Sequence, residues 1–131
     1  MAKQQTVFVV EDQQDLRESI CEELTRNGFS TVGAPHGDKA LQLLRKKSAG
    51  APALILLDLL MPEKDGWEVV AAVKEDVALR DVPIILMSAV PPQATSLKSQ
   101  GVAGSIAKPF TMDELLFVVT RFVKPGPTKK K

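Results

Sequence analysis

Five polar side chains of this chain stand at the ends of short apolar runs, where a buried strand would turn out toward solvent. They are Glu11, Asp12, Asp58, Ser88 and Lys108. Carboxylates, a hydroxyl and an ammonium are the groups that hold a hard cation and neutralise an anionic oxygen. Asp58 is the most informative of them, because an acid that ends an apolar strand costs burial energy unless it is paired or used.

The elements that position these side chains follow from the alternation of apolar runs with helical patterns. β-type runs bounded by turn residues predict strands at residues 6–10, 31–34, 53–57, 83–87 and 102–106. Between them, Asp65 with Glu68 and Thr111 with Glu114 form capping-box patterns that begin helices. Residues 91–100 offer few apolar anchors, so we expect the fourth helix to be short or mobile.

This alternation predicts an α/β fold. Strands separated by single helices must run parallel, and right-handed crossovers place the helices on both faces of one sheet. The expected architecture is a doubly wound, five-stranded parallel sheet flanked by five helices. If the strand order is 2-1-3-4-5, it reverses between the first and third strands, and the crevice there receives Glu11, Asp12 and Asp58.

Three carboxylates in one crevice repel one another, which raises their pKa values or requires a cation. Mg²⁺ fits better than Ca²⁺, which needs a larger ligand cage, or Zn²⁺, which prefers nitrogen and sulfur ligands. Lys108 and the Ser88 hydroxyl can then contact the oxygens of an anion. These groups describe a phosphoryl pocket, in which Asp58 is left to accept the phosphate.

The composition is that of an ordinary globular domain. The chain has 131 residues, 44% of them hydrophobic, and a net charge of +1 with both signs dispersed, so no nucleic acid or membrane partner is expected. The first apolar run is too short for a signal sequence or a membrane span. The lone Cys21 excludes an internal disulfide, and we expect a cytoplasmic protein.

With these features, residues 5–123 resemble the receiver domain of two-component response regulators, which has a flavodoxin-like fold. The resemblance rests on the acidic pair, on Ser88-Ala89, on Lys108-Pro109-Phe110, and on Leu57-Asp58-Leu-Leu-Met-Pro62 with Asp65-Gly66. These motifs stand in family order and near family spacing. Residues 124–131 form a basic tail that we expect to be disordered.

The resemblance implies a role for each matched position at the phosphoryl site. Asp58 is the phosphoacceptor, and the phosphoryl group is contacted by Ser88, Lys108 and the backbone N–H of Ala89. The donor is a phosphohistidine on a sensor histidine kinase or a histidine phosphotransfer protein. The chain is then a signalling domain rather than a conventional enzyme, since it catalyses only its own phosphorylation and dephosphorylation.

The resemblance also implies a ligand set for Mg²⁺. Asp12, Asp58 and the backbone carbonyl of Leu60 bind the ion directly, and Glu11 helps through a water molecule. Phosphorylation would draw in the Ser88 hydroxyl and Lys108. It would thereby shift the conformation of the face made by the fourth helix, the fifth strand and the fifth helix, where a downstream protein binds. We expect the chain to be a stand-alone receiver or the excised receiver of a larger protein.

One departure from the family pattern concerns the output of the signal. Family members usually carry an aromatic residue or histidine three residues before the lysine, and this chain has Ser105. A diverged receiver that docks partners constitutively is therefore an alternative. An aspartyl-phosphate phosphatase would want a second acid where Leu60 stands, and an FMN-binding flavodoxin would want a first loop rich in Ser, Thr and Gly rather than acids.

Three further residues attract attention but are expected to be structural. Cys21 lies within a helical pattern and should be packing. Trp67 is expected to pack from a helix, and His36 is expected in an exposed turn rather than as a ligand or a phosphate carrier.

Slow loss of the phosphoryl group is the first testable prediction. Leu60 and Val90 stand two residues after Asp58 and Ser88, and neither side chain can orient an attacking water by hydrogen bonding. We expect the acyl phosphate of the purified protein to hydrolyse slowly, which a time course of intact mass after removal of the phosphodonor would measure. A half-life of seconds would rule this prediction out.

Overall fold

Five short strands form one parallel sheet. The computed structural model describes residues 5–46, 51–59, 65–90 and 92–126. The strands are β1 (Thr6–Val10), β2 (Ser30–Ala34), β3 (Leu54–Asp58), β4 (Ile84–Ser88) and β5 (Gly104–Ala107). Their order is β2-β1-β3-β4-β5, and every neighbouring pair is parallel. The predicted fold class and strand order are confirmed.

Four of these strands begin or end one or two residues from their predicted bounds. β4 begins at Ile84 rather than Pro83, because proline has no N–H to donate to the ladder. The Pro83 carbonyl still accepts from the N–H of Ile55 at 3.0 Å. β3 ends on Asp58, which pairs with Met87, so this carboxylate belongs to the strand itself.

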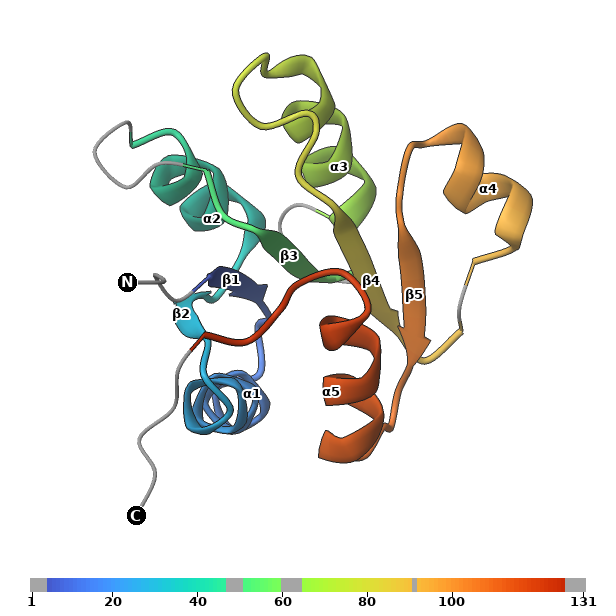
Figure 1. Ribbon diagram of the computed structural model, residues 1–131. Helices are drawn as coiled ribbons and strands as arrows, with labels where there is room; N and C mark the ends of the chain where they lie inside the picture. Colours follow the sequence, from blue (N-terminus) through green and yellow to red (C-terminus); the bar gives the residue numbers. More distant parts are fainter. Residues whose placement is uncertain (1–4, 47–50, 60–64, 91, 127–131) are drawn as a thin grey trace.

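Within the described residues, five helices cover the two faces of the sheet (Figure 1). They are α1 (Gln14–Arg26), α2 (Gly37–Leu44), α3 (Gly66–Glu75), α4 (Ala94–Ser99) and α5 (Met112–Thr120). Helices α1 and α5 lie on one face, and α2 and α3 lie on the other, with α4 beside β5. Six residues long and with none of them buried, α4 is short, as predicted.

Both predicted capping boxes are present. The Asp65 carboxylate accepts from the N–H of Glu68 at 3.0 Å, and the Glu68 carboxylate accepts from the N–H of Asp65 at 3.1 Å. Thr111 and Glu114 make the same reciprocal pair at the start of α5. Each box satisfies backbone donors that the first turn of a helix leaves without partners, so these residues set where α3 and α5 begin.

The core consists of two layers separated by the sheet. Alternate residues of the central strands point to opposite faces, and the two resulting apolar clusters pack against α2 and α3 on one side and α1 and α5 on the other. All five residues of β3 and of β4 are buried, as expected for parallel strands covered on both faces. Trp67 and Cys21 pack against these layers, which agrees with their expected structural roles.

The chain beyond α5 returns across the molecule to α1 (Figure 1). Val123 is buried in the α1–α5 layer, and the N–H of Gly126 donates to the carbonyl of Gly28 at 2.9 Å. Gly28 has a φ of +96°, a conformation that favours glycine in the tight turn between α1 and β2. The rest of the basic tail, residues 127–131, lies outside the described residues.

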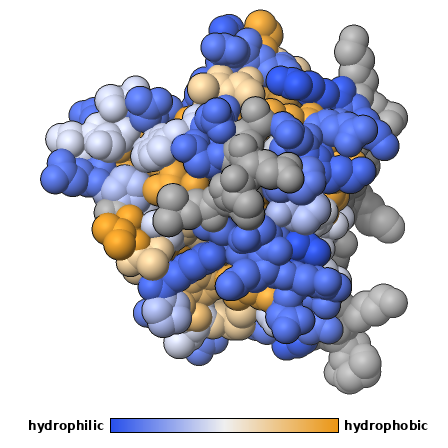
Figure 2. All heavy atoms as spheres, turned by 180° about the vertical axis from the view of Figure 1, so that it is seen from behind, coloured by the Kyte–Doolittle hydropathy of each residue, from blue (hydrophilic) through white to orange (hydrophobic). Residues whose placement is uncertain are grey.

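In Figure 2, hydrophilic side chains dominate the face drawn, with hydrophobic ones in separate spots. Among the residues that the structure describes, the exposed large hydrophobic ones are Val77, Val90, Phe117 and Phe122. Across the described ranges, no helix combines the length and the hydropathy that crossing a membrane requires.

A close backbone contact joins the end of β3 to the start of α3. The N–H of Gly66 donates to the carbonyl of Leu59 at 2.7 Å. A Cβ atom at Gly66 would lie 2.8 Å from the Cα of Leu59 and 3.0 Å from the carbonyl oxygen of Asp58. Both neighbours are backbone atoms, which a change of rotamer cannot move, so only glycine fits at this junction.

Gly66→Ala should therefore destabilise the domain. Alanine is the better helix former, by about 1 kcal/mol, but the clash with backbone atoms should outweigh this gain and leave a net loss of about 1–3 kcal/mol in the free energy of unfolding. Urea unfolding followed by circular dichroism would measure it. Gly104→Ala is the matched control, because its Cβ would meet only the Cδ1 of Ile85 at 3.5 Å. Equal or greater stability of Gly66→Ala would contradict the prediction.

Candidate functional site

Three carboxylates meet at the carboxyl edge of the sheet. Glu11 and Asp12 follow β1, and Asp58 ends the neighbouring strand β3. One oxygen of each lies within 4.8 Å of the others. Glu11 is fully buried and Asp58 is 5% exposed, whereas Asp12 is exposed. The structure thus brings the three predicted acids together at the point where the strand order reverses.

Glu11 is held through its backbone and through both carboxylate oxygens. Its N–H donates to the carbonyl of Ala34 at 3.0 Å, which continues the pairing of β1 with β2. Its Oε2 accepts from the N–H of Gln13 at 3.2 Å, and its Oε1 accepts from the Nζ of Lys108 at 2.7 Å. These bonds satisfy a buried charge that would otherwise be costly.

Lys108, the residue after β5, reaches two of the three acids. Its Nζ lies 2.7 Å from the Oε1 of Glu11 and 3.5 Å from the Oδ2 of Asp58. Burial by itself lowers the pKa of Lys108, but the hydrogen bond with Glu11 and the negative charge of Asp58 raise it more, and the pKa is raised overall. Lys108 is therefore protonated at neutral pH.

The raised pKa also fixes the pH range over which this ion pair stabilises the fold. A lysine whose pKa is higher in the folded state contributes its full stability below the unfolded pKa, about 10.4. The contribution is lost as the pH rises through the higher pKa of the folded state. The contribution of the Lys108 charge is thus constant across the physiological range and is lost in strong alkali.

Ser88 ends β4 next to the acids and is 3% exposed. Its hydroxyl donates to the carbonyl of Val90 at 3.0 Å and accepts from the N–H of the same residue at 3.2 Å. The following residue, Ala89, is exposed. The carbonyl of Leu60, which the family resemblance places among the metal ligands, belongs to a segment outside the described residues.

The donor atoms of this crevice suit a hard divalent cation. All three candidate ligands offer oxygen, and Lys108 supplies a single positive charge among them. Within the described residues, the carboxylates therefore keep an excess of negative charge, which Mg²⁺ would balance. Mg²⁺ prefers one or two carboxylates together with waters and phosphate oxygens, and the exposed Asp12 leaves room for those.

Sequence reasoning missed one residue that the structure places at this site. Arg17, in the second turn of α1, donates from Nη1 to the carbonyl oxygen of Glu11 at 2.8 Å. A long cationic side chain early in the helix that follows an acidic pair was the available signal. Nothing in the spacing alone indicates that the side chain turns back toward the loop.

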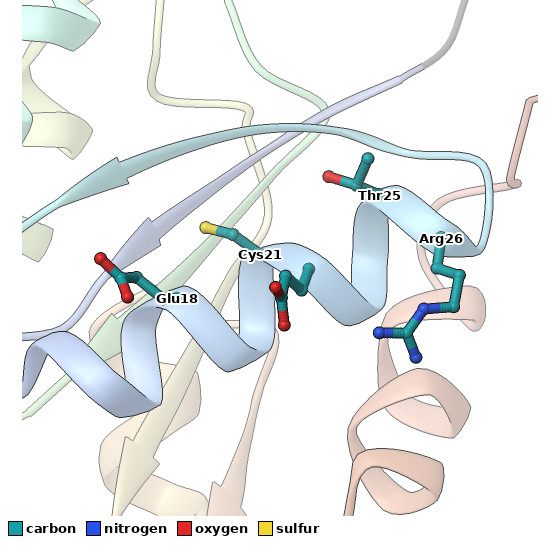
Figure 3. A pocket seen from close by; sticks show the side chains of 5 residues that line it. Glu18, Cys21, Thr25 and Arg26 are labelled. Atoms are coloured by element: carbon teal, nitrogen blue, oxygen red, sulfur yellow. The ribbon is translucent and has the colours of Figure 1, made fainter.

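A separate groove lies along α1. It measures about 620 Å³ and is lined by Glu18, Cys21, Glu22, Thr25 and Arg26, whose side chains project from one helix (Figure 3). Burial raises the pKa of the Cys21 thiol, although a hydrogen bond with Thr31 and the charge of Arg17 lower it in part. The thiol is therefore protonated at neutral pH, and we assign the chemistry to the acidic crevice instead.

His36 is part of the scaffold. It is the N-cap of α2, and its Nδ1 accepts from the N–H of Lys39 at 3.2 Å. The side chain is half-buried rather than fully exposed in a turn, because capping holds it against the first turn of the helix.

Comparison with curated proteins finds relatives that are longer than this chain. It is 32% identical over 112 residues to the phosphate regulon transcriptional regulatory protein PhoB of Klebsiella pneumoniae, a match that covers 84% of this chain and 48% of the relative. The PhoB protein of Escherichia coli matches to the same extent. The chain thus spans about half the length of these relatives.

Solved structures share the fold over nearly the whole chain. The chemotaxis response regulator CheY4 of Vibrio cholerae superposes with a TM-score of 0.84 at 25% identity, covering 92% of this chain and 100% of that protein. The response regulator TrrA of Thermotoga maritima, solved in complex with Mg²⁺-BeF, has a TM-score of 0.76 at 30% identity, covering 91% and 99%. The family model of the response regulator receiver domain matches residues 7–120. This chain belongs to the response regulator receiver domain family.

Proposed function

We propose that this receiver domain accepts a phosphoryl group on Asp58 in a Mg²⁺-dependent reaction and in this way switches a protein-binding face. The convergence of Glu11, Asp12 and Asp58, with oxygens within 4.8 Å of one another, is the observation that carries the proposal. Lys108, with its Nζ 3.5 Å from the Oδ2 of Asp58, provides the positive charge that an incoming phosphoryl group needs.

Asp12 and Asp58 would hold Mg²⁺ directly, together with the carbonyl of Leu60. Glu11 would act through water, because its two carboxylate oxygens already accept from Lys108 and from the N–H of Gln13. When bound, the ion offsets the negative charge of the carboxylates and of the phosphoryl oxygens. The complex of the TrrA relative with Mg²⁺-BeF supports this assignment.

In the proposed reaction, a carboxylate oxygen of Asp58 attacks the phosphorus of a phosphohistidine. The new O–P bond forms as the P–N bond breaks, and the imidazole leaves with the electron pair and takes up a proton. Lys108 keeps its own proton, because its pKa is raised, and its ammonium can then neutralise a phosphoryl oxygen. The backbone N–H of Ala89 and the Ser88 hydroxyl would bind the other oxygens.

The donor would be a sensor histidine kinase or a histidine phosphotransfer protein. A hollow of about 320 Å³ beside the acids is lined by Gln13, Leu16, Ala89, Lys108, Pro109 and Phe110. Its mixture of apolar residues and one ammonium suits a partner that presents a phosphorylated imidazole on a helical surface. A donor bound in this hollow would have its phosphoryl group near Lys108 and therefore near Asp58, the proposed acceptor.

The switch would begin with the Ser88 hydroxyl. Before phosphorylation this hydroxyl bonds to Val90, so contact with a phosphoryl oxygen requires it to exchange partners. The following helix, α4, has no buried residue, and moving it would cost little packing energy. The change would reach the face formed by α4, β5 and α5, where Ser105 and Phe117 line a groove of about 520 Å³.

Ser105 keeps a second function open, that of a receiver which docks partners constitutively. A serine cannot report phosphorylation by the rotation of an aromatic ring, and Ser105 is half-buried on β5. The complete acidic crevice and the protonated Lys108 favour the phosphorylated receiver, because a constitutive module has no need of them.

Intact-mass measurement after incubation with Mg²⁺ and acetyl phosphate tests the proposed acceptor. We expect one phosphoryl adduct on the wild-type chain and none on Asp58→Asn, because the amide is not a nucleophile of this kind. Omitting Mg²⁺ should also abolish the adduct. Asp113→Asn removes an exposed acid on α5 and serves as the control, with labelling equal to wild type. Full labelling of Asp58→Asn would show that the acceptor lies elsewhere.

Lys108→Ala should impair both phosphorylation and folding. It leaves the buried Glu11 carboxylate without its ion pair, so we expect a loss of about 1–3 kcal/mol in the free energy of unfolding without divalent cations. Mg²⁺ should bind the variant more tightly, because a neighbouring positive charge is gone, and restore part of this stability. Chemical unfolding with and without Mg²⁺ measures both effects.

Lys74→Ala is the control for that experiment. The Lys74 ammonium donates to the carbonyl of Arg80 at 2.9 Å on the exposed surface, so its removal should change neither the stability nor the adduct. Wild-type stability of Lys108→Ala in the absence of Mg²⁺ would show that the pair with Glu11 does not stabilise the fold.

A further inference from the structure

Arg17 contacts the peptide unit that joins two of the three acids. Its Nη1 donates to the carbonyl oxygen of Glu11 at 2.8 Å. This carbonyl and the N–H of Asp12 belong to one planar peptide group, so fixing the first fixes the orientation of the second. The N–H of Glu11 is held from the opposite side by the carbonyl of Ala34 at 3.0 Å. The backbone at the acidic pair is thus clamped between α1 and β2.

Asp12 depends on this clamp more than its neighbours do. Glu11 is buried and held through its carboxylate, and Asp58 is the last residue of a buried strand. Asp12 is exposed, and its carboxylate has no hydrogen bond or ion pair with any residue in the described part of the chain. Its place near the other two acids therefore comes from its backbone.

Gly33 provides the path for the Arg17 side chain. A Cβ atom at Gly33 would lie 3.3 Å from the Cδ of Arg17 and 3.4 Å from its Cγ. Glycine inside a strand normally weakens the strand, and here it marks the close approach of another group. Gly33 pairs with Val9 in the sheet, two residues before Glu11. Because Gly33 has no side chain, the aliphatic part of Arg17 can pass close to β2, and its guanidinium reaches the carbonyl of Glu11.

From this geometry we infer that Arg17 is a positioning residue for the divalent-cation site, a role that rests on the proposed function. Its hydrogen bond goes to the backbone of the acidic pair rather than to a carboxylate of the site. It holds the Glu11–Asp12 peptide so that the carboxylate of Asp12 is already directed to the site before the ion arrives. Without it, binding must order this loop, and we expect the affinity for Mg²⁺ to fall about tenfold, as for other groups that orient metal ligands.

The sign of the change separates positioning from simple electrostatics. Arg17 is a cation close to a cation site, so by Coulomb's law alone its removal should make Mg²⁺ bind more tightly. The positioning role predicts weaker binding. A residue that only stabilises the fold would lower the free energy of unfolding and leave the affinity of the folded protein unchanged.

Calorimetric titration of the full chain with Mg²⁺ tests the inference, using Arg17→Met, which keeps the apolar stem and removes the donors. Arg26→Met is the matched control on the same helix, because Arg26 is exposed and pairs only with Glu23 at 2.9 Å among the described residues. Gly33→Val, which obstructs the path of Arg17, is an independent perturbation. We expect Arg17→Met and Gly33→Val each to bind Mg²⁺ about tenfold more weakly than wild type, and Arg26→Met to bind it as wild type does. The double variant Arg17→Met/Gly33→Val should show no further loss of affinity, because both changes remove the same contact.

Each alternative result has a distinct meaning. Unchanged or tighter binding by Arg17→Met, with a wild-type chain that binds Mg²⁺, overturns the positioning role and leaves the proposed function intact. A wild-type chain that binds no Mg²⁺ overturns both. Chemical unfolding in Mg²⁺-free buffer confirms that each variant is folded at the titration temperature, and additive losses in the double variant would show that Gly33 acts by another route.

Discussion

Electrostatic repulsion among three carboxylates is the constraint on which the architecture of this domain depends. Glu11 is fully buried, so bulk solvent does not solvate its charge, and Lys108 compensates it from a position 97 residues away in the sequence. β1 and β5 are not neighbours in the sheet, and the ion pair spans β3 and β4 between them. The pair therefore ties the first and last strands together at the edge where the acids converge.

The backbone around the acids is held by several elements at once. β2 and α1 fix the peptide on either side of Glu11, and the start of α3 is pressed against the last residues of β3 at Gly66. These contacts use carbonyl and N–H groups that would otherwise be left without partners at the ends of strands. The described backbone groups at this edge of the sheet are thus held by hydrogen bonds, which suits a site that must be formed before its ligand binds.

The two sides of the site differ in how firmly they are built. The acidic side rests on β1 and β3. Every residue of these two strands is buried except Thr6, the first residue of β1. The other side ends in the turn from Ser88 to Val90 and in α4, which contributes no buried residue. A hydroxyl that can exchange one hydrogen bond for another, next to a helix with little packing, is the kind of element whose position a new anion can change.

The sequence by itself determined the fold class and the acids of the site, because their signals are local, and the strand order that it led us to expect is the one observed. Apolar runs, helical spacing and the capping boxes are each contained within a few residues, and parallel strands bring their carboxyl ends to one edge. Only the tertiary structure decided that Glu11 is buried and paired with Lys108, that Arg17 turns back across Gly33 to the Glu11 carbonyl, and that Gly66 meets backbone atoms. These contacts join side chains and backbone of different elements, and their formation depends on packing distances that no local pattern contains.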